Sequence, residues 1–170
     1  MVHTYTGAMA DDSTLLQSTA LRNTVDHVED ALIPLVRYLS SPRTWRQIAG
    51  SADIPLDRAR YVVLRAVAET EPVRTTTLAE QVGVDPSTMS RHVAVLDQAG
   101  YVTRAADPDD GRAQALSLTP AGREVMEKAR AARHDLITEA LAGWDDADRT
   151  RLAALLGRLA DDFLRVERAR

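Results

Sequence analysis

The sequence predicts a mainly helical protein that carries one small β-hairpin, and three observations lead to this fold class. Apolar residues recur at helical spacing over most of the 170 residues. Between Thr76 and Gly100, two sets of helix-start and helix-stop signals follow each other directly. Two short β-runs then flank the segment Asp107–Arg112, whose Pro-Asp-Asp-Gly sequence favours a tight turn. Helix, turn, helix and hairpin, in this order, form a winged helix.

The first of these two helices and the turn after it are marked by local signals. Thr77 and Glu80 have the spacing of a capping box, in which a hydroxyl and a carboxylate satisfy the first free amides of a helix. Gly83 suits the left-handed conformation that ends a helix. Asp85 is a good N-cap for the next helix, and Pro86 is a good first helical residue. The apolar face of the first helix consists of Leu78, Ala79 and Val82.

The second helix has two faces of different chemistry. Its core-facing residues at helical spacing are Met89, Val93 and Leu96. The opposite face carries short polar groups, one arginine and one small residue: Ser87, Ser90, Arg91 and Ala94. Such a face can approach the edges of base pairs in a major groove, and Gly100 ends the helix.

Helices are also expected on both sides of this region. Residues 1–12 lack periodicity and are predicted to be a mobile tail, followed by N-terminal helices over 13–56, the winged helix over 57–118 and C-terminal helices over 119–170. Pro34 predicts a kink or break in the first helix. Further helices are expected to begin at Arg43, Asp57, Thr119-Pro120 and Asp145, with the inner stripe of the second of these formed by Ala59, Val62, Val63, Ala66 and Val67.

The first and last helices carry heptad-like apolar seams that the winged helix leaves without a partner. The first seam is Leu21, Val25, Val28, Leu32, Leu35 and Leu39, and the last is Leu152, Leu155, Leu156, Leu159, Phe163 and Val166. Such seams have to be buried against another surface. Two solutions fit the pattern: a dimerisation layer between two subunits, or an antiparallel pair inside one subunit.

Taken together, these motifs resemble the multiple antibiotic resistance regulator (MarR) family. The resemblance lies in Leu78–Glu80, Asp85–Arg91, Gly100–Val102, Asp107–Arg112 and the run Leu116–Gly122. It covers roughly Asp26 to Val166, and the hairpin followed by Leu-Thr-Pro-Ala-Gly is its most specific part. The resemblance implies a homodimer that binds a pseudo-palindromic double-stranded DNA operator, represses transcription and is released by a small aromatic or amphipathic effector.

The candidate DNA contacts are Thr77, Ser87, Thr88, Ser90, Arg91, His92 and Arg112. Arg91 can pair with a guanine edge, and the hydroxyls can contact bases or phosphates. The resemblance implies that Arg112 enters the minor groove and that Asp110 orients it as wing support. The alternatives are a solvated helix face, an exposed Asp-Gly turn with an ion pair of little consequence, and a His92 that packs beside Thr88.

The resemblance also implies an effector crevice near Tyr38, Trp45, Arg46, Tyr61 and Arg65. An arginine beside aromatic rings suits a phenolic carboxylate. The alternative is that Trp45 and Tyr61 belong to the hydrophobic core. The sequence names no effector, operator or regulated gene, and it leaves repression and activation open.

Composition excludes several function classes. The chain contains no cysteine, so thiol-based redox sensing is excluded, and we expect no metal or cofactor because His27 and its acidic neighbours lack the ligand spacing of a metal site. No catalytic arrangement or phosphate-binding loop is present, so an enzyme is not expected. Without a signal-peptide pattern or long apolar run, a soluble cytoplasmic protein is expected.

The charge balance is an objection to DNA binding. The net charge is −4, and residues 76–118 hold six acidic and three basic side chains. Nucleic-acid-binding domains usually carry a basic surface. The competing prediction is therefore a protein–protein interaction module, a winged helix without DNA binding.

Overall fold

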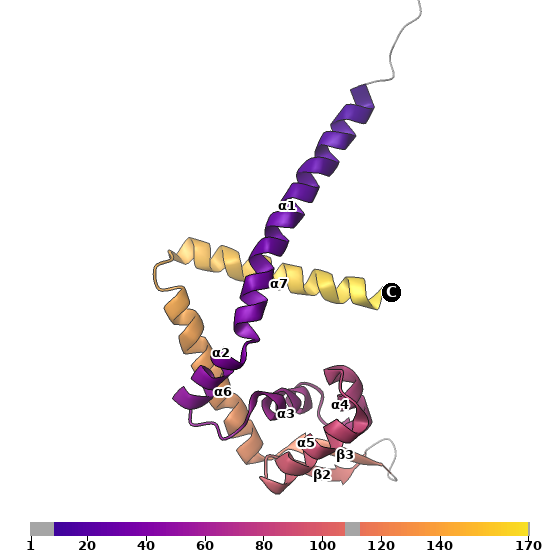
Figure 1. Cartoon of the computed structure of the whole chain (residues 1–170), viewed down its shortest axis with the longest axis vertical. Helices are drawn as coiled ribbons and strands as arrows, with labels where there is room; N and C mark the ends of the chain where they lie inside the picture. The colour runs from indigo at the N-terminus through magenta and orange to yellow at the C-terminus, as the bar shows by residue number, and fades with distance from the viewer. Residues whose placement is uncertain (1–8, 108–112, 170) are drawn as a thin grey trace, which may run out of the picture. The chain divides into compact units, whose positions relative to one another are not determined.

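A computed structural model of the chain describes residues 9–107 and 113–169, with side chains described from residue 22 onward. The chain forms two compact units, Met1–Gln47 and Ile48–Arg170. The described elements are α1 Met9–Leu39, α2 Pro42–Ser51, α3 Arg58–Thr70, β1 Val73–Arg74, α4 Thr75–Val82, α5 Pro86–Gln98, β2 Val102–Ala106, β3 Gln114–Leu118, α6 Pro120–Ala140 and α7 Asp146–Arg168 (Figure 1). The mainly helical fold with a hairpin is thus confirmed.

The first unit is dominated by the long helix α1. The helix begins at Met9 and continues through Pro34 to Leu39, so of the kink or break predicted at Pro34 the break does not occur. The helix thus begins inside the stretch 1–12, for which the sequence predicts a tail. Pro34 removes one backbone hydrogen bond, and the remaining bonds of a 31-residue helix are sufficient to continue it. Ser41 directly precedes α2, and its hydroxyl accepts from the amide of Thr44 over 3.0 Å.

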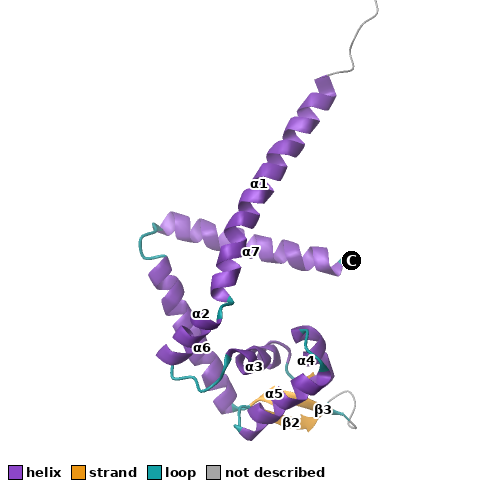
Figure 2. Cartoon of the chain, viewed as in Figure 1, coloured by secondary structure: helices purple, strands orange, loops and turns teal. Residues whose placement is uncertain are grey.

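In the second unit, α3, α4 and α5 gather beside a small antiparallel sheet with strand order β1-β3-β2 (Figure 2). The hairpin β2–β3 pairs Val102 with Leu118 and Ala106 with Gln114. β1 was not predicted, and it pairs Val73 with Leu116 on the other side of β3. A strand of two residues is too short to show an alternating pattern in the sequence.

The core of this unit lies where the three helices meet the sheet. Six side chains from α3, α4 and α5 have 0% exposed surface: Leu64, Val67, Leu78, Met89, Val93 and Leu96. In α3 the buried residues are Tyr61, Val63, Leu64 and Val67, so the predicted inner stripe was partly misplaced. Ala59 is exposed, and Leu64, which was not predicted, takes a central place. Helix α3 contacts both α5 and the sheet, so it buries residues on more than one side. Helical periodicity alone predicts a single buried stripe, which explains why Leu64 was not predicted.

The start of α4 differs from its prediction. The helix begins at Thr75, its N-cap residue is Arg74, and no side chain caps it, so the capping box between Thr77 and Glu80 is wrong. β1 leads directly into the helix and sets this earlier start. The turn after α4 is as predicted, because Gly83 has a φ of 71° and its N–H donates to the carbonyl of Ala79 over 3.0 Å.

The first turn of α6 packs tightly on the turn between α5 and β2. Thr119 caps α6 as predicted, accepting from the amide of Gly122 and donating to the carbonyl of Gly100. The amide of Thr119 donates to the carbonyl of Tyr101 over 3.0 Å. A Cβ on Gly122 would lie 2.1 Å from that same carbonyl oxygen, far inside van der Waals contact. Glycine at this position therefore permits the close approach.

Two further contacts connect α3 with α6. Glu71, directly after α3, accepts from the amide of Leu118 over 2.7 Å and forms an ion pair with Arg123 of α6. Burial would raise the pKa of Glu71, but the hydrogen bonds from Arg123 and Leu118 outweigh it, so the pKa lies below its usual value. Tyr61 of α3 is hydrogen-bonded through its hydroxyl to Arg133, whose guanidinium lies 5.7 Å from the ring centroid.

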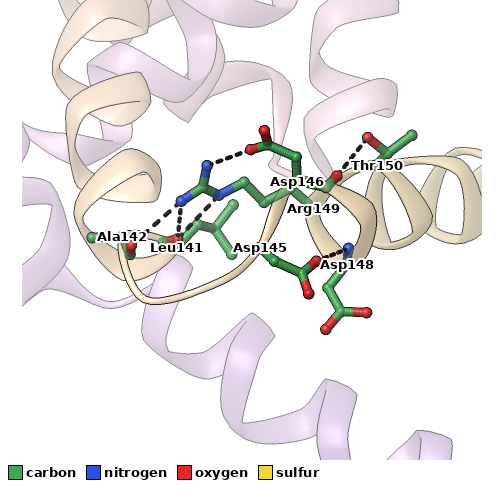
Figure 3. Close-up of polar contacts among 7 residues, drawn as sticks. All are labelled: Leu141, Ala142, Asp145, Asp146, Asp148, Arg149 and Thr150. Atoms are coloured by element: carbon green, nitrogen blue, oxygen red, sulfur yellow. Dashed lines mark hydrogen bonds and ion pairs between the residues drawn. The ribbon is translucent and has the colours of Figure 1, made fainter.

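The corner between α6 and α7 is held by Arg149 (Figure 3). Its guanidinium donates to the carbonyl oxygens of Leu141 and Ala142 at the end of α6, and it pairs with Asp146 over 2.9 Å. Asp145 caps α7 as predicted by accepting from the amide of Asp148. The carbonyls of the two residues that follow α6 thus accept hydrogen bonds from a side chain of α7.

We predict that Gly122→Ala destabilises the protein because the added methyl group has to push α6 away from Tyr101. Overpacking of this kind costs roughly 1–3 kcal/mol, measurable by urea unfolding. Gly50→Ala is the matched control, since a Cβ there would meet no atom within 4 Å apart from its chain neighbours and the nearby backbone of its own helix. Equal stability of Gly122→Ala and the wild type would contradict the close approach.

Candidate nucleic-acid interface

The orientation of α5 is set by its buried side. Met89, Val93 and Leu96 are fully buried, as predicted. Ser87, Ser90 and Arg91 are exposed, and so is Ala94. The polar face expected from the sequence therefore lies at the surface, and its first turn is accessible to a partner.

Asp85 organises that first turn. Its carboxylate accepts from the amide of Thr88 over 2.9 Å and from the hydroxyl of Ser87 over 2.6 Å. The hydrogen bond from Ser87, followed by those from Thr88, holds the pKa of Asp85 well below its usual range. The carboxylate is therefore ionised at neutral pH, and it caps the helix as predicted.

The hydroxyls on this face already have partners within the protein. Ser90 donates to the carbonyl of Pro86 over 2.8 Å, and Ser87 donates to Asp85. Each hydroxyl oxygen keeps acceptor capacity, and rotation would free its proton for another acceptor. Arg91, in contrast, forms no hydrogen bond or ion pair with any residue in the described part of the chain. Its five N–H donors are available for a partner.

Two further predicted contacts lie on α4 and α5. Thr77 is exposed in the first turn of α4, and His92 is half-buried on α5. Asp110 and Arg112 fall outside the described residues. The DNA contacts of all these residues stay predictions.

An ion pair that no sequence motif predicts connects the end of β2 with β1. Asp107, directly after β2, is 9% exposed, and its amide donates to the carbonyl of Ala113 over 2.9 Å. Its carboxylate accepts from Nε of Arg74 over 2.6 Å. The two residues are 33 positions apart, so no local pattern indicates the pair.

These contacts change the meaning of the acidic count between residues 76 and 118. Asp85 caps α5, Asp97 pairs with Arg104 over 2.9 Å, and Asp107 pairs with Arg74. Half of the six acidic groups are thus engaged by donors of the protein itself. Of their cationic partners, Arg104 was already counted, but Arg74 lies outside residues 76–118, so the count left out the cation that pairs with Asp107.

The residues of the predicted effector crevice are divided between the two units. Tyr38, Trp45 and Arg46 belong to the first, and Tyr61 and Arg65 belong to the second. Trp45 and Tyr61 are buried, in agreement with the alternative that they belong to the core. Arg65 pairs with Glu69 over 2.8 Å, and Arg46 donates weakly to the carbonyl of Pro42. The crevice itself stays a prediction.

A cavity of about 400 Å³ lies instead at the corner of α6 and α7. It is lined by His134, Ile137, Thr138, Leu141, Ala142 and Arg149. The guanidinium of Arg149 is already engaged by carbonyls and by Asp146. The described residues include no cluster of three His, Asp or Glu side chains that could hold a metal ion. No helix among them is long and apolar enough to cross a membrane.

Comparison with known proteins identifies the family. Residues 54–113 match the family model described as MarR family. The HTH-type transcriptional regulator YxaD of Bacillus subtilis is 30% identical over 109 residues, which are 64% of this chain and 76% of that protein. The chain belongs to the MarR family. MarR membership implies a DNA-binding transcriptional regulator, and these relatives are regulators, not enzymes.

Solved structures support the same fold. A MarR family protein from Bacillus stearothermophilus superimposes with a TM-score of 0.73, at 19% identity, over 84% of this chain and 97% of its own. A probable transcriptional regulator from Pseudomonas aeruginosa is 31% identical, with a TM-score of 0.52, over 75% of this chain and 96% of its own. The winged helix inferred from the described residues is therefore that of the MarR fold.

We predict that Asp85→Ala lowers stability above about pH 4 because the ionised carboxylate caps α5. The pKa of Asp85 is lower in the folded protein than in the unfolded chain, so its contribution is present above the unfolded pKa. The contribution is lost as pH falls towards the folded pKa. Urea unfolding of both proteins across pH should therefore show their difference shrinking in acid.

Asp85→Asn is the control, because an asparagine also caps a helix but does not titrate. It should keep most of the stability at neutral pH. A gap between Asp85→Ala and the wild type that grows as the pH falls would contradict the lowered pKa.

Proposed function

We propose that this MarR protein is a homodimer that binds a pseudo-palindromic DNA operator through α5 and the wing. In this proposal the bound dimer represses transcription by occlusion, in the cytoplasm, and a small aromatic or amphipathic effector releases it. The observation that carries the DNA contact is the exposed polar face over the first two turns of α5, where Arg91 has no partner among the described residues.

The proposed contacts follow from the chemistry of this exposed face of α5. The guanidinium of Arg91 has the fork geometry that pairs with the O6 and N7 acceptors of guanine. Ser87, Thr88 and Ser90 supply hydroxyls around the helix N-terminus, where a phosphate is also favoured by the helix dipole. Thr77 and His92 are proposed as phosphate contacts on neighbouring surfaces. Arg112 is proposed for the minor groove with Asp110 as its orienting acid, on the sequence resemblance alone.

Dimerisation is supported by the apolar surfaces of the terminal helices. α7 buries none of its side chains, and its exposed apolar residues include Leu155, Leu156, Phe163, Leu164 and Val166. α1 exposes Val25, Val28, Ile33, Leu35, Val36 and Leu39. Apolar rows of this length are stable in water only when another surface covers them. Two linked reading helices would also match two half-sites about one helical turn apart.

The competing function is a protein–protein interaction module without DNA binding. That prediction was based on the acidic count of residues 76–118, and it is weakened because the count left out Arg74, which pairs with Asp107. A gel-shift assay with the DNA upstream of the gene separates the two functions. A specific shift that survives excess random DNA supports the regulator, and its absence, together with failure to select any duplex from random DNA, supports the module.

The dimer is tested by placing charge in the seam of α7. We predict that Leu156→Asp with Leu159→Asp yields a monomer by light scattering and abolishes operator binding, because each aspartate would have to be buried without a partner. Ala154→Asp is the control, since residue 154 lies on the opposite side of a helix with 100° per residue. A wild type that is monomeric at micromolar concentration would refute the dimer.

The base contact is tested with Arg91→Ala. The proposed guanine pair is worth roughly 1–3 kcal/mol of discrimination. We therefore predict weaker operator binding and a relaxed preference at one base pair in each half-site, measured by titration against single-base operator variants. An equal loss on operator and random DNA would show that Arg91 contacts a phosphate instead.

A further inference from the structure

The ion pair between Arg74 and Asp107 connects β1, the end of β2 and the start of α4. Arg74 lies on β1 opposite Ala115 of β3, and it is also the N-cap residue of α4. Asp107 follows β2, beyond the pair Ala106–Gln114. The interaction thus spans the sheet from one edge strand to the other, and it ends beside the first helix of the helix-turn-helix.

The burial of Asp107 makes this pair more than a surface contact. Its side chain is 9% exposed, whereas that of Arg74 is 41% exposed. An ionised carboxylate in such a position is costly unless a cation and hydrogen bonds compensate for the lost water. The 2.6 Å contact with Nε of Arg74 supplies this compensation. By comparison, both partners of the Arg104–Asp97 pair are more than a third exposed.

The backbone of Asp107 completes the arrangement. Its N–H donates to the carbonyl of Ala113 over 2.9 Å and so closes the ladder at the point where the two strands end. The carboxylate of the same residue is held by β1. The position and direction of both strand ends are thereby tied to the start of α4.

We propose that Arg74 and Asp107 are positioning residues for DNA binding, which fix the ends of the hairpin relative to the helix-turn-helix. Neither side chain is assigned a DNA contact. The inference rests on the proposed operator binding, because correct spacing between wing and α5 matters only if both engage the same duplex. Loss of the pair leaves the strands paired but lets their ends shift against α4, so ordering them again on DNA costs affinity.

The test uses the full-length protein and the duplex that the wild type selects from random-sequence DNA. Asp107→Asn keeps the shape of the side chain, keeps Arg74 and removes one negative charge. Charge repulsion alone predicts tighter binding, whereas the positioning role predicts binding about tenfold weaker, which corresponds to about 1.4 kcal/mol. Asp97→Asn is the matched control, because it removes an acid from the exposed pair and should leave affinity unchanged or slightly higher.

A second variant separates positioning from stability. Arg74→Met with Asp107→Leu replaces both charges by apolar groups, and replacement of a whole buried pair is often neutral for folding. We expect its melting temperature to return towards that of the wild type while its affinity stays low. Affinity restored together with stability would mean a structural role only and would overturn the inference, as would unchanged or tighter binding by Asp107→Asn.

Failure of the proposed function would be seen in the wild-type selection step of the same experiment. If the wild type selects no duplex, operator binding is refuted from that result alone, and the positioning role falls with it. If the wild type binds and both variants bind equally well, operator binding stands and only the positioning role is overturned.

Discussion

The burial of six side chains between α3, α4 and α5 is the constraint that fixes the direction of the exposed polar face of α5. Leu64, Val67, Leu78, Met89, Val93 and Leu96 are all fully buried. A fully buried side chain of this size contributes about 1.5–3 kcal/mol relative to exposure. Rotating α5 about its axis would expose Met89 or Val93 and bury Arg91, so the packing allows one orientation. The polar face is therefore directed outward by the core behind it, and the surface residues themselves need no contact that holds them there.

Much of this arrangement could be predicted because its causes are local. Asp85-Pro86 and Thr119-Pro120 begin helices through a side-chain acceptor and a preset φ, and Gly83 and Gly100 end helices at φ values of 71° and 75°. The failures have causes elsewhere in the chain. The start of α4 is set by β1, which pairs with Ala115 and Leu116 much later in the chain. The capping pair at Thr77 and Glu80 was a local signal, and tertiary structure outweighed it.

The candidate site shows the same division between local and distant causes. The exposed face of α5 follows from helical periodicity, which requires only neighbouring residues. The charge around it does not, because Arg74 and Asp107 are far apart in sequence and the counted segment excluded Arg74. A sum of formal charges treats a capped, paired or buried carboxylate like a free one, although each presents a different field to DNA. The effector crevice depends on residues of two units, and sequence spacing gives no information on their approach.

The junction between the winged helix and α6 limits how the winged helix can move relative to the first half of α6. Three kinds of contact meet there: the close approach of Gly122 to Tyr101, the hydrogen bonds of Thr119, and the ion pair of Glu71 with Arg123. Further along α6, Ala129 is fully buried, and beyond it Arg133 binds Tyr61. Tilting α6 against the sheet would disrupt all of these together, and packed interfaces of this density deform little. The first half of α6 is thus mechanically part of the winged helix. In the proposed dimer, a rearrangement that changes the separation of the two α5 helices therefore takes place beyond Arg133, where α6 and α7 are largely exposed.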